Sequence, residues 1–186
     1  MENKSSLTAL ISLFGRAYHV ERDEPVIFCD DLSRCLMTEA EYRQIKNYML
    51  GGIDFFAPDK KDEFAAEDDM LKWIVQTQIA PTPLARGRYC EDSLKTAVLT
   101  GTEQYVILGA GMDTFAFRNS ELMARLNVFE ADHPATQKDK LQRISWAGWE
   151  IPNTLHFVPM DLTQDDLAEK LLAHGYRPEL KTFFSC

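Results

Sequence analysis

The stretch Gln104–Asp132 reads QYVILGAGMDTFAFRNSELMARLNVFEAD, and its pattern decides the fold of this chain. It begins with the apolar run Tyr105–Leu108, which is too short for a buried helix and rich enough in β-branched residues to be a buried parallel strand. The turn Gly109-Ala110-Gly111 follows, and its lack of large side chains lets a ligand lie against backbone N–H groups. A second apolar strand is expected at Asn127–Phe129.

Two acids, Glu130 and Asp132, come directly after this second strand. In doubly wound α/β folds, a strand, a glycine turn and a second strand are followed by a carboxylate about twenty residues beyond the turn, which accepts hydrogen bonds from the ribose of a nucleoside. The same layout here predicts an α/β fold of the Rossmann-like type that holds a nucleoside cofactor. On spacing alone either acid could bind the ribose, and an ordinary tight turn is the alternative explanation of the glycines.

The residues after the glycine turn indicate which nucleoside cofactor to expect. A dinucleotide fingerprint would have a third glycine where this chain has Thr114, and Asp113 would repel a pyrophosphate. The same aspartate suits the α-amino group of a cationic ligand. S-adenosylmethionine has a ribose and an ammonium group but no phosphate, so we expect it as the cofactor. A nicotinamide-dependent oxidoreductase is a distant alternative.

Four strings occur in order along the chain: RGRYCEDSL, YVILGAGMDTFAFR, FEADHPATQKDK and FVPMDL. In these strings the chain resembles the leucine carboxyl methyltransferase family of S-adenosylmethionine-dependent O-methyltransferases. The resemblance implies a class I methyltransferase fold with an N-terminal helical layer. It also implies a seven-stranded sheet, of which this chain would supply only part, so we expect an exposed strand edge through which the chain could self-associate.

The resemblance also assigns roles to single residues. In the family, the second arginine of R-x-R-Y binds the carboxylate of the cofactor's methionine moiety, which here is Arg88; without the resemblance, Arg88 reads as the charged start of a surface helix. The family uses the second acid of E-x-D for the ribose, which favours Asp132 over Glu130.

A third strand is expected at Leu155–Met160, and it too ends in acid, at Asp161. Strand ends collect at one edge of an open α/β sheet, so this carboxylate could accept from the adenine amino group while Leu162 offers the base an apolar surface. The family uses its D-L pair in this way. We expect the next helix to open at Thr163, and capping of that helix is the alternative role for Asp161. The complete set of predicted cofactor-binding residues is Arg88, Gly109, Ala110, Gly111, Asp113, Glu130, Asp132, Asp161 and Leu162.

The chain divides into two expected regions: a helical cap region over residues 1–100 and the N-terminal part of the cofactor-binding domain over residues 101–186. Apolar spacing in the first region predicts helices over 6–18, over 30–50 with a break near Thr38, and over 62–79, the last ended by Pro81 and Pro83. This region could form a lid or a wall of an acceptor pocket, or it could simply pack on the sheet. In the second region we expect a helix over 135–146, with Gln137–Lys140 on its solvated face, and a fourth strand over 181–186.

Composition narrows the classes of partner. The chain has 186 residues and a formal net charge of −9, with no basic cluster, so nucleic acid and anionic membrane surfaces are poor partners. The four cysteines are far apart, which argues against a disulfide framework or a zinc site and for a reduced, cytoplasmic setting. No His and acidic residues stand at the spacing of metal ligands.

Methyl transfer from a sulfonium depends mainly on alignment of acceptor, methyl group and sulfur. A carboxylate acceptor is already ionised and needs no general base, whereas a hydroxyl acceptor does. His133 is the only histidine near the expected site, and a packed or solvent-facing role suits it better, so no catalytic residue is assigned. We expect an O-methyltransferase acting on a carboxylate or hydroxyl of a small molecule or protein; the alternative is a cofactor-binding fragment or an inactive truncated homologue without turnover.

Overall fold

The computed structural model describes residues 6–186, which form two compact units. The helical unit contains Leu10–Arg88, and the sheet unit contains residues 6–9 and Tyr89–Cys186. The first five residues of the expected cap region lie outside the described residues, and its boundary at residue 100 stays a prediction. None of the helices formed by the described residues has the length and apolarity needed to cross a lipid bilayer.

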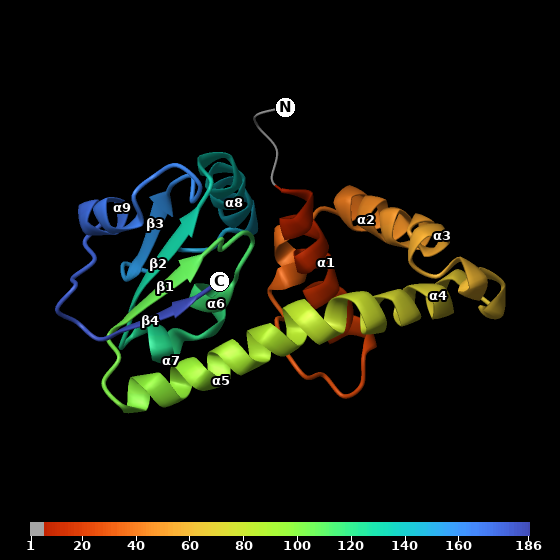
Figure 1. Ribbon diagram of the computed structural model, residues 1–186, viewed down its shortest axis with the longest axis horizontal. Helices are drawn as coiled ribbons and strands as arrows, with labels where there is room; N and C mark the ends of the chain where they lie inside the picture. Colours follow the sequence, from red (N-terminus) through yellow and green to blue (C-terminus); the bar gives the residue numbers. More distant parts are fainter. Residues whose placement is uncertain (1–5) are drawn as a thin grey trace. The chain divides into compact units, whose positions relative to one another are not determined.

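The helical unit is built from a series of helical segments (Figure 1). Buried apolar side chains, among them Leu13, Phe14 and Ile74, form its interior. Phe14 packs against Tyr42 with ring centroids 4.8 Å apart. The backbone at Gly15 approaches Ile79 so closely that a Cβ at Gly15 would lie 2.3 Å from Cγ2 of Ile79. The segments are α1 (Leu7–Arg22), η1 (Ser33–Leu36), α2 (Glu39–Gly51), α3 (Ile53–Phe56), η2 (Pro58–Glu63), α4 (Glu67–Ile74), η3 (Val75–Leu84) and α5 (Ala85–Leu99), with α1 and α5 having residues in both units.

The expected break near Thr38 is confirmed, and a capping box explains it. The Thr38 hydroxyl accepts a hydrogen bond from the Glu41 backbone N–H at 3.2 Å, and the Glu41 carboxylate accepts one from the Thr38 backbone N–H at 2.9 Å. These two contacts satisfy backbone donors that the first helical turn leaves unpaired. The helix α2 therefore starts afresh after η1.

The expectation that Pro81 and Pro83 end the third helix is wrong. Both prolines lie inside η3, a π-helical segment that connects α4 to α5 without a gap. A proline lacks a backbone donor, and its ring crowds the preceding turn of an α-helix. In a π-helix the hydrogen bonds reach one residue further back, as in the bond from Ala85 N–H to the Ala80 carbonyl. With this altered hydrogen-bond pattern, the helix continues through both prolines.

The sheet unit contains four parallel strands in the order β3-β2-β1-β4, shown in green to blue in Figure 1. Their bounds are β1 (Gln104–Leu108), β2 (Asn127–Asp132), β3 (Leu155–Pro159) and β4 (Thr182–Ser185). The register places Leu108 opposite Ala131 and Asp132 opposite Pro159, so the ends of β1, β2 and β3 meet at one edge. This arrangement confirms the predicted Rossmann-like α/β fold.

Helices cover both faces of the sheet, which explains the nearly continuous apolar strands. On one face, side chains of β1, β2 and β3 pack with α5, α6 (Phe115–Arg118) and α7 (Ser120–Met123); the buried members include Leu94, Tyr105, Ile107, Phe115, Met123, Val128 and Leu155. On the other face, α9 (Leu167–Ala173) contributes Leu171 to a cluster with Val106, Phe129, Ala131, Val158 and Met160. The helix α8 (Pro134–Ala147) connects β2 to β3.

Two boundaries in the sheet unit differ from expectation. The strand β2 continues through Glu130 to Asp132, because these residues pair with β3 and Ala131 is fully buried. The helix α9 begins at Leu167 with Asp166 as its cap, not at Thr163. The Thr163 hydroxyl instead donates to the Asp161 carboxylate at 2.6 Å, a local contact that competes with helix formation.

The capping box leads to a stability prediction for the helical unit. Thr38→Ala should lower the free energy of unfolding by about 1 kcal/mol, because the side chain that caps α2 is lost. Thr96→Ala, at an exposed position inside α5, should change it little or raise it slightly, because alanine favours helix. Urea denaturation monitored by circular dichroism measures both, and equal stabilities of the two variants would contradict the assignment of the cap.

Candidate functional site

The glycine turn after β1 has the backbone that its sequence predicts. Gly109 and Gly111 have φ values of +69° and +53°, a region that residues with a Cβ rarely adopt. The N–H groups of Gly109 and Ala110 point to the Ala131 carbonyl, at 2.8 and 3.4 Å, which docks the turn on the end of β2. A Cβ at Gly109 would meet no described heavy atom within 4 Å, so the turn is open there.

The Asp132 carboxylate lies directly against this turn. Its Oδ2 accepts a hydrogen bond from the Gly111 backbone N–H at 2.5 Å, and its Oδ1 accepts one from the His133 N–H at 2.6 Å. The side chain is half-buried. The fold thus brings together the two features on which the predicted nucleoside site depends: bare backbone after the first strand and a carboxylate at the end of the second.

Glu130 lies inside the protein, with an exposed fraction of 0%. Its carboxylate is paired with the ammonium group of Lys140, and its backbone carbonyl accepts a hydrogen bond from the Gln137 side chain at 2.5 Å. Burial raises the pKa of Glu130 to about 7; Lys140 opposes this rise, and the negative charges of Asp113 and Asp132 add to it. Of the two acids Glu130 and Asp132, Asp132 is therefore the one whose side chain is partly accessible to solvent.

The expectation that Gln137–Lys140 forms a solvated face is wrong for its first and last residues. Gln137 and Lys140 are buried, and Lys138 is the exposed member of the run. The helix α8 starts with Pro134 at its first position, and Thr136, Lys140 and Ile144 then follow at spacings of four on the buried side. This helical stripe could have revealed Lys140 from sequence, because it shares the phase of Ile144.

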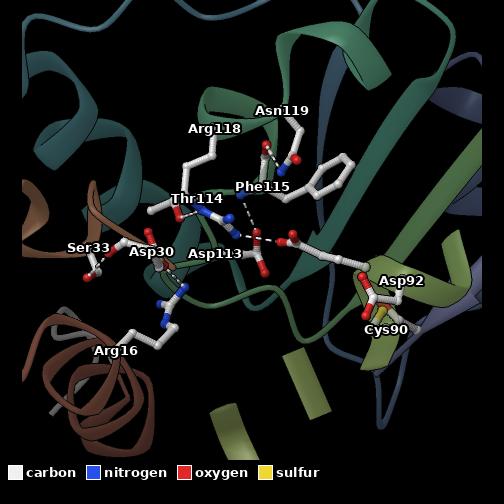
Figure 2. Close-up of polar contacts among 12 residues, drawn as sticks. Arg16, Asp30, Ser33, Cys90, Asp92, Asp113, Thr114, Phe115, Arg118 and Asn119 are labelled. Atoms are coloured by element: carbon white, nitrogen blue, oxygen red, sulfur yellow. Dashed lines mark hydrogen bonds and ion pairs between the residues drawn. The ribbon is translucent and has the colours of Figure 1, made fainter. Parts of the chain in front are cut away.

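Asp113 lies one residue before Thr114, the N-cap of the short helix that follows the glycine turn. Its Oδ1 accepts from the Phe115 backbone N–H at 2.6 Å, as Figure 2 shows. Beside it, Arg118 donates to the Thr114 hydroxyl at 2.8 Å (Figure 2). The same guanidinium donates to the Glu91 carboxylate at 2.6 Å. The contact with Glu91 ties α5 to α6 within the sheet unit, and no short sequence pattern indicates it because Arg118 and Glu91 lie 27 residues apart.

Asp161 and Leu162 follow β3 at the same edge of the sheet. Asp161 accepts from the Thr163 backbone N–H and hydroxyl at 2.9 and 2.6 Å and from the Gln164 side chain at 2.9 Å. The hydroxyl of Thr163 is the main cause of the lowered pKa of Asp161. Leu162 is 46% exposed, which leaves an apolar surface accessible. Asp161 therefore orders its own turn and does not cap α9.

The remaining predicted residue, Arg88, lies on α5 in the helical unit, where its guanidinium donates to the Ile27 carbonyl at 3.3 Å. The other predicted residues all lie in the sheet unit. His133 is exposed and accepts from the Ala135 backbone N–H at 3.2 Å, which makes it a cap of α8. Within the described part of the chain, no group of His, Cys, Asp and Glu has the arrangement of a metal site.

The raised pKa of the buried Glu130 predicts how the stability of the protein depends on pH. Because the folded protein holds the Glu130 proton more tightly than the unfolded chain, stability should fall as pH rises from 4.5 towards 7. In Glu130→Leu/Lys140→Met this titration is absent. Relative to that variant, the wild type should lose on the order of 3 kcal/mol of unfolding free energy over this range.

Urea denaturation at a series of pH values measures this difference. Lys138→Met serves as a control, because it removes a lysine from the exposed side of the same helix and should follow the wild-type pH profile. Parallel profiles for the wild type and the double variant would show that Glu130 does not titrate in this way.

The chain matches the family described as leucine carboxyl methyltransferase over residues 9–186. It is 47% identical over 185 residues to YktD of Bacillus subtilis, named as a candidate S-adenosyl-L-methionine-dependent methyltransferase, and the match covers 99% of this chain and 60% of that protein. Proteins with the same candidate name from Mycolicibacterium paratuberculosis and Frankia alni are 35% and 29% identical over 67% and 90% of this chain, and over 40% and 52% of their own lengths. The chain thus spans about half the length of these curated relatives. By this match over nearly all of its residues, it belongs to the leucine carboxyl methyltransferase family.

Proposed function

We propose that this chain binds S-adenosylmethionine at the carboxyl ends of β1, β2 and β3, as the cofactor-binding part of an O-methyltransferase. The observation that carries this proposal is the hydrogen bond from Gly111 N–H to the Asp132 carboxylate, which sets a carboxylate beside a glycine turn that is open at Gly109. Family membership and the names of the relatives support the same reading.

The chemistry of the side chains fits this cofactor better than a dinucleotide. Asp132 would accept the ribose hydroxyls, and Asp161 with Leu162 would receive the adenine. Asp113, at the end of the turn, would attract the α-amino group. Together these acids favour a cationic ligand and oppose a pyrophosphate.

Two further assignments come from the family pattern. Arg88 is assigned to the methionine carboxylate on that pattern alone, and Gly109–Gly111 would cradle the methionine portion. When bound, the cofactor supplies an electrophilic methyl group on its sulfonium.

The acceptor would be an oxygen of a carboxylate or hydroxyl, on a small molecule or a protein. Holding the reacting atoms in line can contribute about 7–11 kcal/mol to catalysis without a general base. His133, the histidine beside Asp132, is engaged as a cap of α8, which favours an acceptor that is already ionised.

We also propose where the protein is located and how it could self-associate. All four cysteines lie among the described residues and none forms a disulfide, which supports a cytoplasmic location. Among the described strands β3 and β4 each pair with one neighbour only, so self-association would use one of these two outer edges of the sheet.

Substitution of Asp132 tests the cofactor site. Isothermal titration calorimetry of the wild type should detect S-adenosylmethionine and S-adenosylhomocysteine but not NAD. Asp132→Asn should weaken both interactions by about tenfold to a hundredfold, because a charge-assisted hydrogen bond contributes roughly 1.5–3 kcal/mol. Glu150→Gln, an exposed acid of the same unit, is the matched control and should bind as the wild type does.

The outcomes of this titration separate the alternatives. Wild-type binding that Asp132→Asn leaves unchanged would contradict the placement of the ribose. Binding of S-adenosylmethionine, together with no methyl transfer in a separate activity assay with carboxylate and hydroxyl acceptors, would point instead to a cofactor-binding chain without turnover. Binding of NAD in preference to S-adenosylmethionine would overturn the proposed cofactor.

A second test compares alanine substitutions at two glycines that both have a positive φ. Gly109 and Gly101 have φ values of +69° and +92°, and a Cβ at either would meet no heavy atom of residues 6–186 within 4 Å. Alanine at either position should therefore cost about 1 kcal/mol of unfolding free energy from backbone strain. Only Gly109→Ala should also weaken S-adenosylhomocysteine binding, because its methyl group would project into the ligand site. Equal affinities of the two variants would contradict this placement of the ligand.

A further inference from the structure

We propose that Glu130, Gln137 and Lys140 are positioning residues of the cofactor site: the contacts of α8 with Glu130 hold the end of β2 so that the Asp132 carboxylate stays on the Gly111 N–H. None of the three would touch the ligand; they would act through Asp132. The consequence for ligand affinity rests on the proposed function. The consequence for the Gly111 contact does not.

The contacts between α8 and β2 converge on one residue. Lys140 pairs with the carboxylate of Glu130, and the Gln137 side chain donates to the backbone carbonyl of Glu130 at 2.5 Å. Gln137 and Lys140 lie one helical turn apart, so both reach the strand from the same side of α8. The helix thus binds the side chain and the main chain of Glu130 at once.

Asp132 follows Glu130 on the same side of the strand, because side chains two residues apart share a face. Its backbone carbonyl accepts from Met160 N–H at 2.9 Å, and α8 begins at Pro134, two residues later. The segment from Glu130 to Pro134 is therefore held by α8 at Glu130 and by the start of the same helix at Pro134. Asp132, with its bond to Gly111, lies between these two points.

The cost of burying two charges indicates that the Glu130–Lys140 ion pair serves to position the end of β2 more than to stabilise the fold. Glu130 and Lys140 both have exposed fractions of 0%, so both charges are removed from water. Glu130 Oε1 accepts no hydrogen bond from any described residue, which adds to the cost of burial. Apolar residues of similar volume often serve stability as well as or better than a buried ion pair. The pair is therefore best explained by the geometry that it imposes on the end of β2.

The test replaces the pair by apolar residues and observes the Gly111 contact directly. In a ¹⁵N-correlated NMR spectrum without ligand, the Gly111 amide proton reports its hydrogen bond to Asp132. Glu130→Leu/Lys140→Met should shift this resonance upfield and weaken binding of S-adenosylhomocysteine by roughly tenfold, by analogy with residues that orient metal ligands. Gln137→Met removes one contact and leaves the pair, so it should shift the resonance in the same direction by less, and it keeps the test usable if the double variant does not fold.

Lys138→Met is the control, since it removes a lysine from the exposed side of α8 and should leave both the resonance and the affinity unchanged. A folded double variant, or Gln137→Met in its place, with the wild-type Gly111 resonance and wild-type affinity would overturn the proposal. If the wild type fails to bind S-adenosylhomocysteine, the proposed function fails. The Gly111 resonance would still decide whether the three residues position Asp132.

Discussion

The hydrogen bond between the Asp132 carboxylate and the Gly111 N–H is the interaction on which the candidate site depends. It requires a positive φ at Gly111, so that the N–H can face the end of β2. It also requires the parallel pairing of β1 with β2, which brings the ends of the two strands to one edge. The hydrophobic clusters on the two faces of the sheet keep that pairing in place. Fold and site are thus two consequences of the same strand register.

Charge around this bond is unevenly distributed, and the distribution suits a cationic ligand. Asp113, Glu130 and Asp132 lie close enough for the first and last to raise the pKa of the second. The cation that compensates Glu130 is the buried ammonium group of Lys140, which faces the interior and leaves the negative charge of Asp132 on the accessible side. A sulfonium ligand would be attracted by such a field, and a pyrophosphate would be repelled.

The sequence predicted the sheet well because strand and turn signals are local. Four strands, the glycine turn, the start of α8 near Pro134 and the break near Thr38 all follow from short patterns. The prolines of η3 were misjudged because a π-helical path depends on neighbouring segments. Lys140 was misjudged because charged residues are usually exposed, and its partner lies ten residues away in another element. The contact between Arg118 and Glu91 has no local signal at all. The roles of the predicted site residues stay predictions.

A crystal structure of this chain with S-adenosylhomocysteine would show where the cofactor binds. We expect the ribose hydroxyls within hydrogen-bonding distance of the Asp132 carboxylate, with the adenine beside Leu162 and the amino acid portion along Gly109–Gly111. A ligand bound away from the ends of β1 and β2, or a ribose that contacts no carboxylate of β2, would contradict this placement.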